Sequence, residues 1–526
     1  SGIVDPGKDD PTLAQDFLAR RNGTDVTIVP DKTYTLLYGS VGTIAYDRRL
    51  LSSTIDEARF ESFSRAEKLL ALAAAQSLAA LKTSLERYTG DRLQCIIGAS
   101  GDGCGEYDEA LFLESLHERL KTVEPDPARR KKFSAVLEKA WANPFTGTPV
   151  PKYQDVINRV FGRPVRAYVV DAACASSLYS IDLGMKALRN HSADAVLAAG
   201  VFAPGPANST LFAQFRGLTP EASRPLDAAA DGVVFGHGAG VLVLKRLTDA
   251  VADGDRILAV VRSVGVSSDG KSPAINVPQS KGQSLAVRRA YEMPGIAVDT
   301  IQYVEAHATG TPVGDAVEFQ ALRESIPRSA GLAPIELGSV KSLIGHTGWA
   351  AGVASVIKLC KAFENRTVPG QFNFSRTGPD IPLEASQFTI SKTSHAWPEN
   401  IAGAPRRAAI NGFGFGGTNA HLVLEEYNAP FHKRLCGRAA ATPPAKLAVI
   451  HWAALFPARQ ELAAATPNGE RRFDRKLLRL PKGKMLLPDV REHMDPCQYL
   501  VSLAAEQVLA RIPDQWPKLR SEIGVV

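Results

Sequence analysis

A single cysteine stands where a predicted strand turns into a predicted helix, and this junction constrains the chain more than any other feature. The sequence Asp-Ala-Ala-Cys-Ala-Ser-Ser-Leu fills residues 171–178, directly after a β-branched and aromatic run at 165–170. After the cysteine, apolar residues recur at helical spacing: Leu178, Ile181, Met185 and Leu188. Cys174 is thus expected at the positive end of a helix, where backbone N–H groups favour the nucleophilic thiolate over the thiol. On this segment alone, Cys174 could equally be a small buried hydrophobe.

The length and charge of the chain narrow the classes of protein to which it can belong. Its 526 residues, 45% of them hydrophobic, exceed one ordinary domain and can bury sizeable cores. The net charge of +6 is spread along the chain, so no nucleic-acid partner is expected. The basic clusters at 129–132 and 471–472 are interpreted as solvated surface, with a dock for an acidic carrier as the alternative.

The spacing of the cysteines and the hydropathy of the chain indicate the cellular compartment of the protein. The six cysteines lie far apart and form no Cys-x-x-Cys pair: Cys95, Cys104, Cys174, Cys360, Cys436 and Cys497. We therefore expect neither a disulfide framework nor a metal site, and a cytoplasmic location. No signal peptide is recognised, and the uncharged stretch 195–215 is broken by Gly, Pro, Asn and Ser. This stretch predicts a core strand plus a loop rather than a membrane span.

The order of predicted elements favours an α/β fold. A helix is expected over 65–85, buried strands at 93–98 and 195–199, and an apolar helix at 349–363. Another helix is expected to start near Ala316, after a Thr/Gly-rich loop at 308–315. The charged stretch 101–160 is interpreted as a surface excursion or lid. Alternating strands and helices over this length predict covered sheets in an α/β sandwich.

Two histidines share one local setting, each at a predicted strand-to-helix turn beside threonines and glycines. His307 and His346, taken with Cys174, supply a nucleophile and two imidazoles, which suits acyl-thioester chemistry, although either histidine alone could be structural. Lys341 could stabilise a carboxylate or tune a histidine, or it could be a solvated helix terminus. The glycine-rich loop at 412–417 allows close backbone approach and offers N–H groups as an oxyanion hole.

Four motifs together resemble the signatures of β-ketoacyl synthases of the thiolase superfamily, in order and at their usual separations. They lie at 171–178, 305–315, 338–347 and 411–421, and the similarity covers about 10–426. The resemblance implies a thiolase-like five-layered αβαβα sandwich with two pseudo-repeated halves, usually dimeric. It also implies decarboxylative Claisen condensation on carrier-protein thioesters, which extends a chain by two carbons without a metal or redox cofactor.

The same resemblance assigns residue roles. Cys174 would accept the acyl group, His307 and His346 would promote decarboxylation of a malonyl thioester, and Lys341 would support His346. The N–H groups of Cys174 and Phe415 would form the oxyanion hole, with Phe415 also gating the malonyl side. The remaining substrate-binding residues, which would contact the phosphopantetheine arm or line its path, are Thr309, Thr311, Phe413, Gly414 and Gly416.

The sequence departs from the usual β-ketoacyl synthase pattern at two positions, and one stretch bears on the subclass of synthase. His237 stands where such synthases commonly have Glu, and we expect it to be structural; Ala308 replaces a usual glycine. The stretch 266–283 is more similar to iterative polyketide and polyunsaturated-fatty-acid synthases than to modular ones. Two alternatives share the fold: a catalytically silent chain-length-factor-like partner and a non-decarboxylating thiolase-type acyltransferase.

The C-terminal part is interpreted as the start of a second copy. Residues 1–426 would form the β-ketoacyl synthase domain, 427–445 a linker, and 446–526 a partial second ketosynthase-like, chain-length-factor-like segment. A helical adaptor is the alternative for the last segment. The expected partners are an acyl carrier protein and either a second copy, giving a homodimer, or a chain-length factor, giving a pseudo-dimer.

Overall fold

The computed structural model describes residues 33–81, 85–100, 119–120, 123–140, 152–270 and 272–436, with a few isolated positions besides. The chain divides into two compact units, 1–441 and 442–526. The expected second copy at 446–526 lies outside the described residues except for Val501 and Ala505.

The first sheet has four strands in the order β6, β5, β7, β9. The first three run parallel, and β9 is antiparallel to β7. Every residue of β5 and β7 is buried, as expected for apolar strands covered on both faces. The strand bounds are β5 (Leu93–Gly98), β6 (Arg166–Val170), β7 (Ala195–Phe202) and β9 (Gly238–Leu244).

The second sheet has six strands in the order β10, β17, β16, β11, β12, β14. Within it, the run β12, β11, β16, β17 repeats the order and directions of the first sheet: two parallel steps, then one antiparallel step. The two pseudo-repeated halves expected from the sequence are thus present. The bounds are β10 (Ala259–Ser268), β11 (Tyr303–Glu305), β12 (Ile335–Gly338), β14 (Phe388–Thr389), β16 (Arg407–Gly414) and β17 (Thr418–Glu426).

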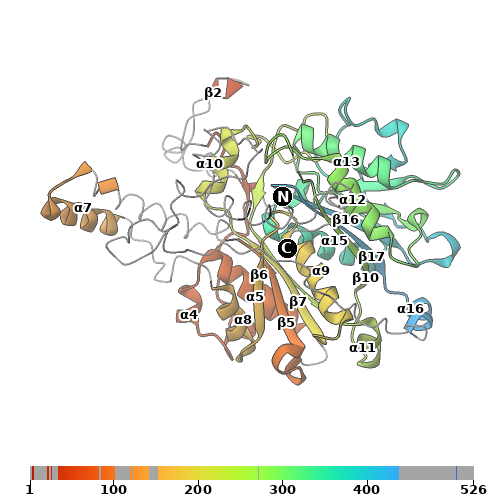
Figure 1. Ribbon diagram of the computed structural model, residues 1–526, viewed down its shortest axis with the longest axis horizontal. Helices are drawn as coiled ribbons and strands as arrows, with labels where there is room; N and C mark the ends of the chain where they lie inside the picture. Colours follow the sequence, from red (N-terminus) through yellow and green to blue (C-terminus); the bar gives the residue numbers. More distant parts are fainter. Residues whose placement is uncertain are drawn as a thin grey trace. The chain divides into compact units, whose positions relative to one another are not determined.

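Helices lie between the sheets and on both outer faces (Figure 1). The central layer holds α9 (Ser176–Arg189) and α15 (Ala351–Glu364), which contact strands of both sheets. On the outside, α5 (Arg65–Ala79) and α8 (Tyr153–Phe161) cover the first sheet, and α12 (Ser280–Tyr291) and α13 (Pro312–Ser325) cover the second. This stacking is the five-layered thiolase-like α/β fold that the sequence predicts.

The remaining elements, apart from the 14-residue α7, have at most nine residues each. The helices are α3 (Arg48–Leu51), α4 (Glu57–Glu61), α7 (Pro127–Ala140), α10 (Pro206–Gln214), α11 (Leu247–Ala252), α14 (Lys341–Ile344) and α16 (Ala429–Cys436). The strands are β1 (Ile3–Val4), β2 (Arg21–Asn22), β3 (Asp25–Val26), β4 (Tyr38–Gly39), β8 (Phe235–Gly236), β13 (Thr367–Val368) and β15 (His395–Ala396). Helix α16 lies inside the segment expected to be a linker.

Close approach of the layers requires small residues. A Cβ on Gly200 of β7 would lie 2.8 Å from Ser177 Cβ on α9 and 2.8 Å from the carbonyl oxygen of Trp349. A Cβ on Gly412 of β16 would lie 2.8 Å from Leu178 on the same α9. These glycines let both sheets press against the helix that follows the cysteine.

Three expectations about elements need correction. The helix predicted over 65–85 ends at Ala79, because Leu85 reaches the core from a separate 3₁₀ turn. The stretch 195–215 contains α10 after its strand rather than a loop, and Pro206 begins that helix. The helix expected to start near Ala316 begins at Pro312 for the same reason. Within the described residues, no helix combines the length and the apolar character that crossing a membrane requires.

Candidate active site

Cys174 lies in the tight turn between β6 and α9. The preceding Ala173 has a left-handed backbone with φ of 48°, and the Ser176 hydroxyl accepts a hydrogen bond from the Ala172 N–H at 2.8 Å. The Thr418 hydroxyl from β17 donates to the Ala172 carbonyl oxygen at 2.6 Å. A left-handed alanine is strained, so neighbouring bonds from both halves of the molecule hold this turn.

His346 reaches the sulfur from the other half of the fold. It follows β12 and α14, and its Nε2 lies 3.0 Å from the Cys174 Sγ. Its backbone N–H donates to the Val234 carbonyl oxygen at 2.6 Å, and the preceding Gly345 has φ of 75°. His346 is buried, with 3% of its surface exposed.

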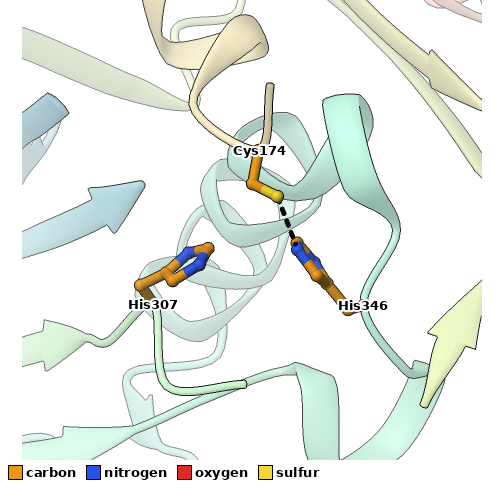
Figure 2. A group of neighbouring side chains, drawn as sticks. All are labelled: Cys174, His307 and His346. Atoms are coloured by element: carbon orange, nitrogen blue, oxygen red, sulfur yellow. Dashed lines mark hydrogen bonds between the residues drawn. The ribbon is translucent and has the colours of Figure 1, made fainter. Parts of the chain in front are cut away.

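His307 completes the group from the end of β11. Its ring centre lies 5.4 Å from that of His346, with the two planes at 87°. Figure 2 shows both imidazoles converging on the sulfur. One donor atom from each of Cys174, His307 and His346 lies within 4.8 Å of the others. The structure thus brings together the nucleophile and both imidazoles that the sequence singled out.

The group opens into a cavity of about 400 Å³. Its lining includes Cys174, His307 and His346, and also every residue expected to bind substrate: Thr309, Thr311, Phe413, Gly414, Phe415 and Gly416. The two threonine hydroxyls lie 3.2 Å apart on one wall. Lys341 does not line the cavity but is buried behind it with 2% exposure.

The protonation of Cys174 differs from the expectation. Burial raises the pKa of the Cys174 thiol to about 11, although a hydrogen bond from the Phe415 N–H and the charge of Lys341 partly offset it. The thiolate expected from the helix terminus is therefore not the resting form at neutral pH. The nucleophile must lose its proton as it reacts.

Both imidazoles are neutral. Burial and the nearby charge of Lys341 hold the pKa values of His307 and His346 well below the usual value of 6.5. The Nδ1 atoms of both rings are buried and have no hydrogen-bond partner among the described residues. An unpaired lone pair costs less than an unpaired N–H, so the proton belongs on Nε2. Both rings then direct N–H donors into the cavity.

The glycine-rich loop after β16 supplies a backbone donor and an aromatic wall. The backbone N–H groups of Phe415 and of Cys174 itself both lower the pKa of the Cys174 thiol, so both lie close to the sulfur. The Phe415 ring packs against Phe212 and Phe215, with ring centres 5.8 and 6.0 Å away. Two N–H groups that meet at one sulfur can stabilise an oxyanion formed beside it.

Sequence reasoning missed one residue of the site. Glu318 of α13 is buried and accepts hydrogen bonds from the backbone N–H groups of His307 and Ala308, both at 2.7 Å. The available signal was a glutamate within the helix predicted to start near Ala316, three residues after Asp315. His237 does not line the cavity; its backbone N–H donates to Gly39 and its ring packs on Tyr38, which fits the expected structural role.

The comparisons with known proteins agree on one family. Residues 45–250 match the profile of the beta-ketoacyl synthase N-terminal domain, 258–375 that of its C-terminal domain, and 378–454 that of the ketoacyl-synthetase C-terminal extension. The chain is 41% identical over 272 residues to a phenolphthiocerol/phthiocerol polyketide synthase polypeptide of Mycobacterium tuberculosis, covering 51% of this chain and 17% of that protein. It is 40% identical over 285 residues to another polypeptide of the phenolphthiocerol/phthiocerol polyketide synthase, from Mycobacterium bovis, covering 53% of this chain and 16% of that protein. The chain thus spans about a sixth of the length of these relatives.

Solved structures give the same result. An oxazolomycin ketosynthase domain from Streptomyces albus is similar with a TM-score of 0.63 and 28% identity, covering 76% of this chain and 66% of that one. The ketosynthase of module 6 of the bacillaene synthase from Bacillus subtilis gives 0.64 and 26%, covering 81% and 67%. A structure named PfaC keto synthase-chain length factor gives 0.62 and 27%, covering 81% and 48%.

Proposed function

This chain belongs to the β-ketoacyl synthase family of the thiolase superfamily, and we propose that it condenses a Cys174-bound acyl chain with malonyl-acyl carrier protein. The observation that carries the proposal is the convergence of one sulfur and two imidazoles within 4.8 Å on a single cavity. The relatives are named polyketide synthases, so we propose a polyketide or fatty-acid chain as the product.

In the first half-reaction the Cys174 sulfur attacks an acyl thioester. The thiol proton leaves as the new carbon–sulfur bond forms, and it ends on the departing pantetheine sulfur. The Nε2–H of His346, 3.0 Å from the Cys174 sulfur, stabilises the charge that develops on that sulfur. The N–H groups of Cys174 and Phe415 hold the negative charge on the carbonyl oxygen. The acyl group ends as a thioester on Cys174.

In the second half-reaction a malonyl thioester loses carbon dioxide. The bond between the carboxylate and the α-carbon breaks, and its electrons move toward the thioester oxygen. The Nε2–H groups of His307 and His346 donate to that oxygen as charge develops, and they need no prior ionisation because both rings are neutral. The resulting carbanion attacks the Cys174 thioester, and the sulfur leaves as a thiolate, which takes up a proton from solvent to return to the thiol.

The cavity suits a long, flexible arm carried by a partner. Its wall offers the hydroxyls of Thr309 and Thr311, which we propose as hydrogen-bond partners of the phosphopantetheine arm of an acyl carrier protein. We propose no intrinsic cofactor. A cytoplasmic location, expected from the cysteine spacing, stays a prediction.

The proposed function also includes a partner protein that pairs with strand β6. This strand is the edge of the first sheet, and its Tyr168 and Val169 are 38% and 49% exposed. An exposed apolar edge strand favours pairing with another strand. We propose that a second copy, or the chain-length-factor-like partner suggested by the PfaC likeness, pairs here. Residues 446–526 as the start of such a partner, joined by 427–445, also stay a prediction.

The test uses acyl and malonyl thioesters of a carrier protein. The unaltered chain should gain one acyl group on Cys174, seen by intact mass and peptide mapping, and should release carbon dioxide from malonyl carrier protein. Cys174→Ala should lose acylation and condensation but keep some decarboxylation, while Cys360→Ala, a half-buried cysteine outside the cavity, should match the unaltered chain. Acylation at another residue would contradict the proposal. Acylation without decarboxylation would instead favour the thiolase-type acyltransferase, and neither reaction would indicate a silent partner.

A further inference from the structure

Four polar side chains form a continuous hydrogen-bonded chain behind His307. The Tyr291 hydroxyl lies 3.0 Å from Nε2 of His421, whose Nδ1 lies 2.6 Å from Oδ1 of Asn411. The Asn411 amide nitrogen lies 2.7 Å from Oε1 of Glu318. Glu318 then accepts from the backbone N–H groups of His307 and Ala308. The chain crosses four elements, α12, β17, β16 and α13, before it reaches the site.

The direction of every hydrogen bond in the chain follows from its carboxylate end. Glu318 accepts three hydrogen bonds, so Asn411 must present its NH₂ group to it and its Oδ1 to His421. His421 must therefore donate from Nδ1 and accept at Nε2, which leaves the Tyr291 hydroxyl as the donor. Each member has one arrangement that satisfies its neighbour, and His421, Asn411 and Glu318 are almost fully buried.

His307 depends on this chain because its own ring is weakly held. Its Nδ1 has no hydrogen-bond partner among the described residues, and its side chain otherwise meets the rings of His346 and Phe413. The described hydrogen bonds that fix its backbone include the one from its N–H to Glu318. The peptide plane, and with it the direction of the Cα–Cβ bond, is therefore set by where the Glu318 carboxylate lies.

We propose that His421 and Tyr291 are positioning residues for the decarboxylation step, acting through Asn411 and Glu318 to hold His307 in line with the malonyl carbonyl. This inference rests on the proposed function. It assigns a role to the last histidine of the 411–421 motif, and to a tyrosine of α12 outside every recognised motif. Acyl transfer to Cys174 makes no use of His307, so its rate should not depend on the hydrogen bonds among Tyr291, His421, Asn411 and Glu318.

The test compares three variants of the full chain in the two half-reactions. His421→Leu leaves Oδ1 of Asn411 without a donor, and an ångström-scale shift of a catalytic group costs about 10²-fold, so we expect kcat for malonyl decarboxylation to fall about 10- to 100-fold. Acylation of Cys174 should stay within about twofold and KM for malonyl carrier protein should not change. His421→Asn, whose amide can replace the Nδ1–H donor, should recover most of the loss. Tyr291→Phe should show a smaller decrease of the same kind.

Tyr179→Phe is the matched control. It removes another partly buried tyrosine hydroxyl, 3.3 Å from the carbonyl oxygens of Ser267 and Asn419, that has no part in the chain. It should change neither half-reaction. Equal losses in acylation and decarboxylation for His421→Leu, or no recovery in His421→Asn, would overturn the proposal.

A structure of His421→Leu gives a readout that does not depend on activity. We expect the Asn411 amide to rotate and the His307 ring to move relative to Cys174, with the fold unchanged. An unmoved His307 would overturn the inference even if the chain proves to be a β-ketoacyl synthase. Absence of both half-reactions in the unaltered chain would instead contradict the proposed function and leave the His307 displacement as the deciding measurement.

Discussion

Cys174 and His346 occupy corresponding turns of the two halves of the fold, and their side chains meet at 3.0 Å although 172 positions separate them in the chain. Cys174 follows β6 and precedes α9; His346 follows β12 and precedes α15. Because the two sheets share strand order, their internal repeat brings the N-terminal ends of both central helices together. Each half thus contributes part of one site, and neither half contains the whole site.

Removing the buried charge of Lys341 should slow the reaction of Cys174 with alkylating reagents. The Lys341 ammonium lowers the thiol pKa, so Lys341→Met should raise it further above about 11. Each unit of rise is a tenfold loss of thiolate, so we expect alkylation by iodoacetamide to slow by about 3- to 10-fold at about pH 8. The rate should climb with pH along a curve displaced to higher pH. Lys361→Met, whose side chain is 70% exposed, is the control and should leave the curve in place.

Truncating Phe415 should admit larger reagents to Cys174. Phe415→Ala removes the ring that packs on Phe212 and Phe215 but keeps the backbone N–H at the sulfur. The rate with a bulky maleimide should therefore rise severalfold relative to the rate with iodoacetamide. Phe372→Ala, an exposed phenylalanine outside the cavity lining, should not change this ratio. An unchanged ratio in Phe415→Ala would mean that the ring does not limit access.

A charge on the edge of the first sheet should separate the proposed dimer. Val169→Lys places an ammonium group on a residue of β6 that is 49% exposed, where a paired strand would bury it. Light scattering after gel filtration should give twice the chain mass for the unaltered protein and a single chain mass for the variant. Leu258→Lys, at a residue that is 54% exposed and outside β6, should keep the dimer. A monomeric unaltered protein would contradict the proposed pairing.

Acid should destabilise the fold through Glu425. Burial opposes its ionisation, yet hydrogen bonds from His432 and Arg262 and the charges of Arg262 and Arg407 lower its pKa to about 2. A lowered pKa stabilises the fold above the usual value of 4.5, and this contribution is lost as the pH falls from 4.5 toward about 2.

Glu425→Gln tests this contribution directly. It should cost about 3–5 kcal/mol of unfolding free energy at neutral pH, because it leaves buried cations unpaired. The loss should shrink in acid, as urea titrations at several pH values would record. A constant difference between the two proteins across that range would contradict the assignment.

The sequence was sufficient to find three residues that the structure brings together, because each stands beside small or hydroxyl-bearing residues that mark a strand-to-helix turn. Cys174, His307 and His346 were all identified in this way, and the structure places them together. The alternation of apolar strands and helices was likewise sufficient for the layered α/β fold. These signals come from residues close together in the sequence, so they can be recognised without knowledge of the fold.

Properties set by packing were not predictable from the sequence. The thiolate expected for Cys174 is disfavoured because the folded layers bury the sulfur, which no single segment encodes. Glu318 accepts a hydrogen bond from the backbone N–H of His307, which follows a strand. That strand end meets the helix of Glu318 only in the folded chain, so the contact could not be predicted. The helix predicted over 65–85 is too long, because Leu85 continues the apolar spacing of the helix although it lies in a separate 3₁₀ turn.

Phe415 places an aromatic ring and a backbone N–H at the same point of the cavity. Its ring lines the cavity beside Phe212 and Phe215, and its N–H lowers the pKa of the Cys174 thiol. Because both groups belong to one residue, a displacement of the loop backbone after β16 moves them together. The shape of the cavity and the acidity of the sulfur are therefore linked through a single loop.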